Sequence, residues 1–153
     1  QRGAVEYEPA RRAAVHQRAD GVLQVRLASA TDRAVGQLLL RWLAGIATDE
    51  LRGRLEETSR ATGIDYVRMR LRRQRTRWGS CSAAGTISLN VCLMFQRPGV
   101  VRYLLVHELC HRLQMNHSPR FWSLVESHEP GWRALDAELL KGWRYVPAWV
   151  FSG

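Results

Sequence analysis

Residues 107–117, HELCHRLQMNH, combine three histidines with one glutamate at spacings that suit a metal site. His107 and His111 are four residues apart in a segment with helical periodicity, so both imidazoles point the same way and can share one metal ion. Glu108 lies beside His107 and can reach a metal-bound water without ligating the metal. With five histidines in 153 residues, random placement would give this HExxH arrangement in roughly one per cent of chains. The pattern therefore predicts two zinc ligands and a general base.

The third ligand of a catalytic zinc site is expected to be His117, ten residues after the first histidine of the motif. Catalytic zinc uses three protein ligands and keeps one position open. If the motif helix ends near residues 115–116, the chain can turn His117 back toward the other imidazoles, and Asn116 tolerates the left-handed conformation that such a turn would need. Glu126 and Glu129, on the next predicted helix, are the rival ligands.

These residue types predict hydrolysis. Zinc held by three neutral imidazoles lowers the pKa of bound water to near 7. Glu108 would accept a proton from that water as it attacks a carbonyl, and would pass the proton to the leaving amine. Tyr103, His128 and Tyr145 are candidates for a second group that stabilises the developing negative charge, and the sequence favours none of them. Cys110 lies off the face shared by the two motif histidines, so we expect it to be a buried packing residue.

The elements that must position these residues follow an α+β order. Alternating apolar residues predict strands over 21–28, 64–71 and 86–93, of which the last two would pair as a hairpin. Helical periodicity and capping residues predict helices from residue 31 or 32, from 48 or 49 to Gly63, over 100–115, from 118 or 119 to 129, and over 132–140. We interpret residues 1–20 as an arm or an early strand.

Two segments near the motif helix could contribute to a substrate cleft. The strand predicted over 86–93 is a candidate for binding an extended peptide by strand addition, and an ordinary interior strand is the alternative. Residues 78–81, WGSC, are either a loop near the cleft or a turn in which Trp78 packs in the core and Gly79 adopts a special φ.

The composition fits one globular domain in a reducing compartment. The 153 residues, 46% of them hydrophobic, suffice for a single domain with a core over residues 1–153. No apolar run approaches the roughly 20 residues of a membrane span, and the N-terminal segment has no apolar stretch typical of a secretory signal. The three cysteines form no CxxC pair, which argues against a disulfide framework. We therefore expect a cytoplasmic protein that does not insert into membranes.

Three sequence strings occur in the order found in the YgjP-like metal-dependent hydrolases: RTRWGSCSAAGTISLN at 75–90, HELCH at 107–111 and NHSPRFW at 116–122. Residues 64–145 thus resemble this family, which is similar to the SprT-like and Wss-type zinc metalloproteases. The resemblance implies a compact zincin-like domain, in which a small antiparallel sheet packs on the HExxH helix and further helices follow. It also implies one zinc ion held by His107, His111 and His117, with Glu108 as the base, and a protein or peptide substrate.

A basic segment precedes the motif. Of the 23 basic residues 22 are arginine, and six arginines with no acid lie between Tyr66 and Arg77. Arg68, Arg70 and Arg72 share one face of a predicted strand, and Arg73, Arg75 and Arg77 continue the run. Such a stripe could neutralise phosphates beside aromatic residues that stack on bases. The alternatives are a solvated strand face that prevents edge aggregation and ion pairs with Glu8, Glu56 or Glu57. SprT-like and Wss-type proteases are associated with cleaving proteins crosslinked to DNA, so the resemblance adds weight to DNA as a partner.

The sequence predicts a zinc metallopeptidase that cleaves peptide bonds with a zinc-bound water and a glutamate base, with DNA-associated protein as one substrate class. Two alternatives stay open: a nucleic-acid-binding module with a structural metal site, and a zinc hydrolase of a non-peptide amide. An open fourth position on the metal would favour the enzyme. A fourth protein ligand, such as Cys110 or Glu126, would favour the structural site.

Overall fold

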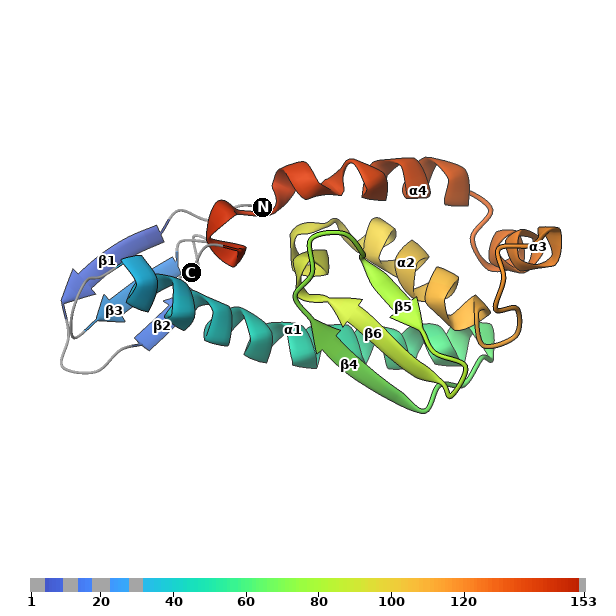
Figure 1. Ribbon diagram of the computed structural model, residues 1–153, viewed down its shortest axis with the longest axis horizontal. Coiled ribbons are helices and arrows are strands. Elements are labelled where there is room, and N and C mark those ends of the chain that lie inside the picture. Colours follow the sequence, from blue (N-terminus) through green and yellow to red (C-terminus); the bar gives the residue numbers. More distant parts are fainter. Residues whose placement is uncertain (1–4, 10–13, 18–22, 28–31, 152–153) are drawn as a thin grey trace. The chain divides into compact units, whose positions relative to one another are not determined.

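The computed structural model describes residues 5–9, 14–17, 23–27 and 32–151 (Figure 1). In chain order the elements are β1 (Val5–Pro9), β2 (Ala14–Gln17), β3 (Leu23–Leu27), α1 (Asp32–Thr62), β4 (Arg68–Arg72), β5 (Gly79–Cys81), β6 (Thr86–Asn90), η1 (Val91–Phe95), α2 (Pro98–Cys110), α3 (Pro119–His128), α4 (Trp132–Leu140), η2 (Gly142–Tyr145) and η3 (Ala148–Val150). The predicted α+β class is confirmed. The chain divides into two compact units, residues 1–46 with 146–153 and residues 47–145. That residues 1–153 form one domain stays a prediction.

The first unit contains a three-stranded sheet in the order β1-β3-β2. β1 runs parallel to β3 and β2 runs antiparallel to it, so the strand predicted over 21–28 is the central strand where the structure describes it. Residues 1–20 supply its two partners. Thr31, a predicted helix cap, lies outside the described residues. The apolar cluster of this unit consists of Val35, Leu38 and Leu39, with Trp42 and Trp149 packed against them.

A single helix, α1, takes the place of the two helices predicted between residues 31 and 63. The break expected at residues 48–49 is wrong, because the buried stripe of the helix continues through that point. Residues at four-residue intervals, each at most 2% exposed, form this stripe: Leu43, Ala47, Leu51 and Leu55. A continuous apolar face outweighs the capping tendency of Thr48 and Asp49, since most helical stability comes from burying such a face.

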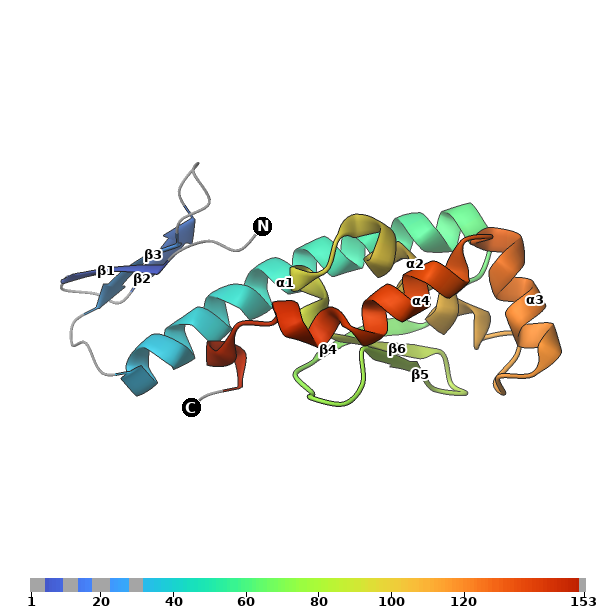
Figure 2. The same ribbon diagram turned by 90° about the horizontal axis from the view of Figure 1, so that it is seen from above.

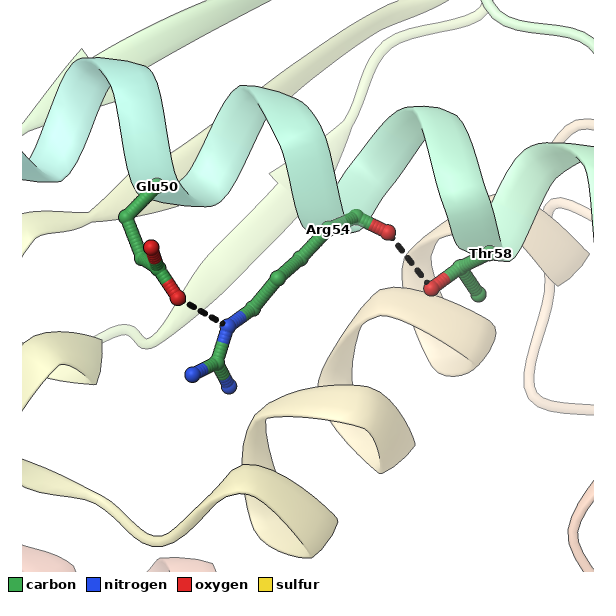
Figure 3. A network of polar contacts seen from close by, with 3 residues as sticks. All are labelled: Glu50, Arg54 and Thr58. Carbon is green, nitrogen blue, oxygen red and sulfur yellow. Dashed lines mark hydrogen bonds and ion pairs between the residues drawn. The ribbon is translucent and has the colours of Figure 1, made fainter.

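Polar contacts support the C-terminal half of α1 (Figure 3). Arg54 Nε donates to Glu50 Oε1 at 2.8 Å, one helical turn away, and the Thr58 hydroxyl donates to the Arg54 carbonyl oxygen at 2.8 Å. The helix ends where the sequence predicts. Gly63 adopts φ +71°, and its N–H donates to the Ser59 carbonyl at 2.9 Å, as a glycine after a helix C-terminus commonly does.

The second unit contains the sheet nearest the motif, in the order β4-β6-β5. β6 is its central strand, because it pairs in parallel with β4 and antiparallel with β5. The hairpin predicted between 64–71 and 86–93 is therefore wrong, and the sheet is mixed. The pattern missed β5, since three residues are too few to show an alternation. β5 forms the hairpin with β6 instead, through a turn in which Gly85 adopts φ +95°.

The motif helix α2 lies at the centre of this unit. It is in contact with β5, α3 and α4 (Figures 1 and 2), and most of its side chains are buried. It begins at Pro98, two residues before the predicted start, because proline suits the first helical turn. It ends at Cys110, earlier than residue 115. None of the described helices is both long enough and apolar enough to span a bilayer.

The two following helices agree with the sequence. The Ser118 hydroxyl caps α3 by accepting the Phe121 N–H at 3.3 Å, and Pro119 occupies the first helical position. Residues 129–131 separate α3 from α4, which covers the predicted range 132–140. Together they pack on α2 around the motif.

Candidate metal centre

The three motif histidines bring imidazole nitrogens together at the C-terminal end of α2. Nε2 of His117 lies 3.2 Å from Nε2 of His111 and 3.3 Å from Nε2 of His107. Among the described residues these three histidines form the one group of potential ligands whose donor atoms all lie within 4.8 Å of one another. They could therefore hold a metal ion.

The separations fit a tetrahedral ion. Zinc–nitrogen bonds of about 2.0–2.1 Å at tetrahedral angles place ligand nitrogens roughly 3.3 Å apart. The observed distances of 3.2 Å and 3.3 Å agree with that value. The donor set also suits zinc, since three imidazoles with one further position is a common catalytic arrangement for this metal.

Hydrogen bonds on the far side of two rings direct their Nε2 lone pairs into the cluster. Nδ1 of His107 lies 3.2 Å from the Tyr103 hydroxyl, which donates to Asp136 Oδ1 at 2.8 Å. Nδ1 of His111 lies 3.0 Å from the Gln114 carbonyl oxygen. Because the Tyr103 proton points to Asp136 and a carbonyl can only accept, both Nδ1 atoms carry the ring proton. The two Nε2 atoms are then unprotonated, as metal ligation requires.

Burial favours the neutral form of His107 and His111. Desolvation lowers the pKa of His107 to about 3, and the neighbouring His111 and His117 lower it too. Desolvation also lowers the pKa of His111, although the hydrogen bond to the Gln114 carbonyl opposes the shift. The neutral ring is the form that binds a metal. The cluster can therefore accept a cation near neutral pH without first losing protons from His107 or His111.

Aromatic side chains of α3 pack against the rings. Phe121 is fully buried and stacks on His111, with ring centres 4.3 Å apart and 22° between the planes. Trp122 stacks on His117 at 5.7 Å and 26°, and on Trp132 of α4 at 4.3 Å. These contacts restrict rotation of the imidazoles, so α3 helps to preorganise the cluster.

A tight turn after α2 returns the chain to the cluster. The N–H groups of Leu113 and Gln114 both donate to the Cys110 carbonyl, at 3.1 Å and 3.0 Å. No described non-glycine residue has a positive φ, so the left-handed conformation predicted for Asn116 is wrong. His117 lies directly before Ser118, the N-cap of α3. The start of α3 therefore fixes the position of the third histidine.

Glu108 is a buried residue of α2 whose side chain lies against β5. It is 4% exposed, and desolvation raises its pKa to about 8, a shift that the nearby Arg77 opposes. A Cβ on Gly79 would lie 3.2 Å from both Cγ and Oε2 of Glu108. The absence of a side chain at Gly79 lets the strand approach the carboxylate this closely.

The segment 78–81 combines both interpretations of the sequence. Trp78 is packed in the core as predicted, 7% exposed, and stacks on Trp143 with ring centres 4.0 Å apart. The special φ predicted for Gly79 is wrong, because among the described glycines only Gly63 and Gly85 have positive φ. Gly79 belongs to a strand that borders the cleft, and its size matters there more than its conformational freedom.

A cleft of about 270 Å³ opens onto the cluster. The cleft is lined by residues of three segments, namely β5 with the residue two positions before it, the HExxH motif, and the turn that follows the motif. These residues are Arg77, Gly79, Ser80, Cys81, His107, Glu108, His111, Met115 and His117. The three histidines and the glutamate of the motif therefore border one open space that a substrate could enter.

The predicted helper residues lie elsewhere. Tyr103 is fully buried, and its hydroxyl holds His107, so it orients a ring of the cluster. Neither His128 nor Tyr145 lines the cleft. The sequence candidates for stabilising negative charge on the substrate thus have no direct access to it in this structure.

The rival ligands also have other roles. Glu126 Oε1 lies 3.6 Å from Arg133 Nη1, and Glu129 Oε2 lies 3.5 Å from Arg102 Nε. Neither carboxylate belongs to the histidine cluster. Cys110 is buried and free, as predicted, and burial raises the pKa of its thiol to about 12. The geometry thus favours His117 over both acids as a ligand.

The arginine run is divided between two places. Arg68, Arg70 and Arg72 are exposed on β4 and alternate with half-buried residues, as predicted. Arg73 and Arg75 are exposed in the connection to β5. Arg77 is exposed in the same connection, and it also borders the cleft. Nucleic-acid contact through Arg68, Arg70, Arg72, Arg75 and Arg77 stays a prediction.

Sequence reasoning missed one contributor to the site and misplaced another. Asp136 lies 33 residues after Tyr103, and only the packing of α4 on α2 brings the two together. Asp136 is half-buried in α4. Its position as an acid in a predicted helix is the only, weak, indication in the sequence that it could contribute to the site. Arg77 was assigned to the arginine stripe because β5, which turns the chain toward the motif, was not recognised.

Comparisons with known proteins identify the family of this chain. The sequence model of the YgjP-like family, metallopeptidase domain, matches residues 1–141. No curated protein sequence matches the chain. The solved structure of the metallopeptidase zymogen abylysin from Pyrococcus abyssi is similar over 60% of this chain and 92% of its own, with 25% identity and a TM-score of 0.54. The metallopeptidase zymogen jannalysin from Methanocaldococcus jannaschii shares the fold over 60% and 94%, with 15% identity and a TM-score of 0.52. The chain therefore belongs to the YgjP-like metallopeptidase family of metal-dependent hydrolases.

Proposed function

We propose that this metallopeptidase is a zinc enzyme in which His107, His111 and His117 hold the ion and Glu108 is the general base. The observation that carries the proposal is the convergence of three Nε2 atoms, with separations of 3.2 Å and 3.3 Å, beside a carboxylate that borders the same cleft. Zinc, when bound at these nitrogens, supplies Lewis acidity and lowers the pKa of water in its open position to near 7.

Glu108 performs the proton transfers in this proposal. Burial raises its pKa to about 8, and positive charge in the site favours the carboxylate form and opposes that rise. A base with a pKa near the working pH both accepts and releases a proton efficiently. Glu108 therefore takes a proton from the attacking water and delivers it to the leaving amine, while the carbon–nitrogen bond of the peptide breaks.

The substrate would bind along β5. The segment predicted for strand addition, residues 86–93, contains β6, which is paired on both sides and has no free edge. β5 is one of the two edge strands of the sheet, and its residues Gly79, Ser80 and Cys81 line the cleft. An extended peptide can pair with such an edge through its backbone, which places a peptide bond beside the histidine cluster.

Metal analysis with two matched variants tests the proposal. We expect one zinc per wild-type chain, hydrolysis of an unstructured protein such as casein, and full zinc content without hydrolysis in Glu108→Gln. His117→Ala should weaken zinc binding tenfold or more, on the order seen for changes in a metal's surroundings. His128→Ala, which removes a histidine outside the cluster, should keep native zinc affinity.

The same measurements separate the alternatives. Unchanged turnover in Glu108→Gln would remove Glu108 from the mechanism. Native zinc affinity in His117→Ala would move the third ligand to Glu126 or Glu129. Zinc binding without hydrolysis of any peptide would support a structural site or a non-peptide amide substrate.

A further inference from the structure

Arg77 is a cation at the edge of the candidate active site, close enough to Glu108 to oppose the rise in its pKa. It borders the cleft together with Glu108 and the three histidines. Other arginines of the same unit are engaged: Arg54 with Glu50, Arg97 with Glu138, Arg102 with Glu129 and Arg133 with Glu126. In the part of the chain that the structure describes, no carboxylate forms an ion pair with Arg77.

The backbone on either side of Arg77 is held in place. Asn90, 1% exposed, donates from Nδ2 to the carbonyl oxygens of Gln74 at 2.7 Å and Arg77 at 2.8 Å. The Asn90 N–H donates to the Trp78 carbonyl at 2.9 Å, and the Trp78 ring is stacked on Trp143. The arginine is therefore presented from a fixed backbone, and only its own side chain must order when it binds a ligand.

The charges around the cleft favour an acidic ligand. Arg77 is the one permanent cation among the residues that line it, and the single acid, Glu108, is 4% exposed. A guanidinium forms paired hydrogen bonds to a carboxylate, stronger than those between neutral groups. Arg77 directly precedes Trp78 and β5, the strand along which a peptide would lie. A side chain of that peptide close to the scissile bond can thus reach the guanidinium.

We propose that Arg77 is a specificity residue that selects peptides carrying an aspartate or glutamate close to the scissile bond. This inference rests on the peptidase activity proposed above. It separates Arg77 from Arg68, Arg70 and Arg72, which lie exposed on β4. The cleft position favours a carboxylate of the substrate over a nucleic-acid phosphate, because the guanidinium lies beside the groups that would act on a peptide bond.

Matched peptides and a charge reversal test the proposal. Fluorogenic peptides are compared in sets that carry Glu, Gln or Lys at one position on either side of the cleaved bond. With the zinc-loaded full chain we expect kcat/KM for the Glu peptide to exceed that for the Gln peptide by about tenfold at the responsive position. Arg77→Glu should reverse the order and favour Lys, and Arg77→Gln should remove the discrimination. Arg52→Glu, an exposed arginine of α1, makes the same change in net charge and should keep the wild-type preference.

Binding gives a readout that does not depend on turnover. Zinc-loaded Glu108→Gln should bind labelled Glu peptide about tenfold more tightly than Gln peptide in fluorescence anisotropy. Adding Arg77→Gln should abolish that difference, with zinc content unchanged. If the wild-type chain binds peptides with this preference but cleaves none, the proposed function fails while the role of Arg77 stands.

Three outcomes would overturn the role of Arg77. The preference for Glu could persist in both Arg77 variants, or it could change equally in Arg52→Glu, which would make it an effect of net charge. A single-stranded oligonucleotide could bind in a manner that depends on Arg77 while the peptide ratio stays at one, which would assign the arginine to nucleic acid.

Discussion

Gly79→Ala is the smallest change that should disturb the candidate active site. A Cβ at this position would lie 3.0 Å from Leu104 Cδ1 and 3.2 Å from Cγ and Oε2 of Glu108. Carbon contacts are most favourable near 3.5–4.0 Å, so β5 and α2 must separate by a few tenths of an ångström. Gly79 does not have a positive φ, so the backbone itself accepts alanine and the effect is steric.

The contacts set the size of the effect. Adding a methyl group to a packed site lowers the free energy of unfolding by about 1–3 kcal/mol. Replacing glycine also reduces the conformational entropy of the unfolded chain, which raises the free energy of unfolding by about 0.4–1 kcal/mol. We therefore expect a net loss in unfolding free energy of about 1 kcal/mol. Misplacing a catalytic group by 1 Å can cost about 100-fold. A shift of a few tenths in Glu108 should lower kcat about three- to tenfold.

The assay combines kcat on a peptide, zinc content and urea unfolding. Gly53→Ala is the control, because a Cβ there has nothing within 4 Å and lies in the interior of α1. It should stabilise the fold by about 0.5–1 kcal/mol and leave kcat unchanged. Zinc content should stay at the wild-type level in both variants. A Gly79→Ala enzyme with wild-type kcat would refute the reasoning, and so would a loss of zinc, since the contact is with the base.

Three further predictions follow from the electrostatics and the hydrogen bonds. Between about pH 7.5 and 8.5 the metal-free chain should lose unfolding free energy as pH rises, by up to about 1.4 kcal/mol per unit, because Glu108 holds its proton in the folded state, with a pKa of about 8, but not in the unfolded chain. The lowered pKa values of His107 and His111 act in the opposite sense, and their effect fades within about one pH unit above 6.5, as the unfolded imidazoles lose their protons. Glu108→Gln should therefore flatten this slope in urea titrations of chelator-treated protein, and an unchanged slope would contradict the burial argument. Tyr103→Phe should weaken zinc binding about tenfold with little loss of fold, measured by competition with a chromogenic chelator, and unchanged affinity would show that the hydroxyl does not orient the ring. If the arginine stripe on β4 binds DNA, the affinity should fall steeply with salt concentration, and this dependence should be weaker in Arg70→Ala/Arg72→Ala. An affinity that does not change with salt concentration would exclude DNA binding through this stripe.

The sequence predicts the motif helix and the grouping of the three histidines well because both depend on local spacing. His107 and His111 face the same way on any helix, and His117 follows only six residues after His111. The caps of α1 and α3 also agree, since Gly63 and Ser118 act on their immediate neighbours. Such features need no knowledge of the distant chain.

The errors concern contacts between distant segments. β5 is three residues long and polar, so its pairing with β6 leaves no periodic signal, and the parallel pairing of β4 with β6 could not be inferred without it. The continuity of α1 through Thr48 and Asp49 depends on packing of its buried stripe, which overrides local capping tendencies. Asp136 joins the site only through packing of α4 on α2.

The bond from Tyr103 to Asp136 couples the histidine cluster to a helix, α4, that contributes no histidine to it. If docking of α4 strengthens metal binding by orienting the His107 ring, thermodynamic linkage requires the metal to strengthen docking of α4 by the same factor. Amide hydrogens in α4 should then exchange more slowly in the zinc-loaded chain than in the metal-free chain. A mutation or a proteolytic cleavage that loosens α4 would therefore weaken metal binding without changing any histidine.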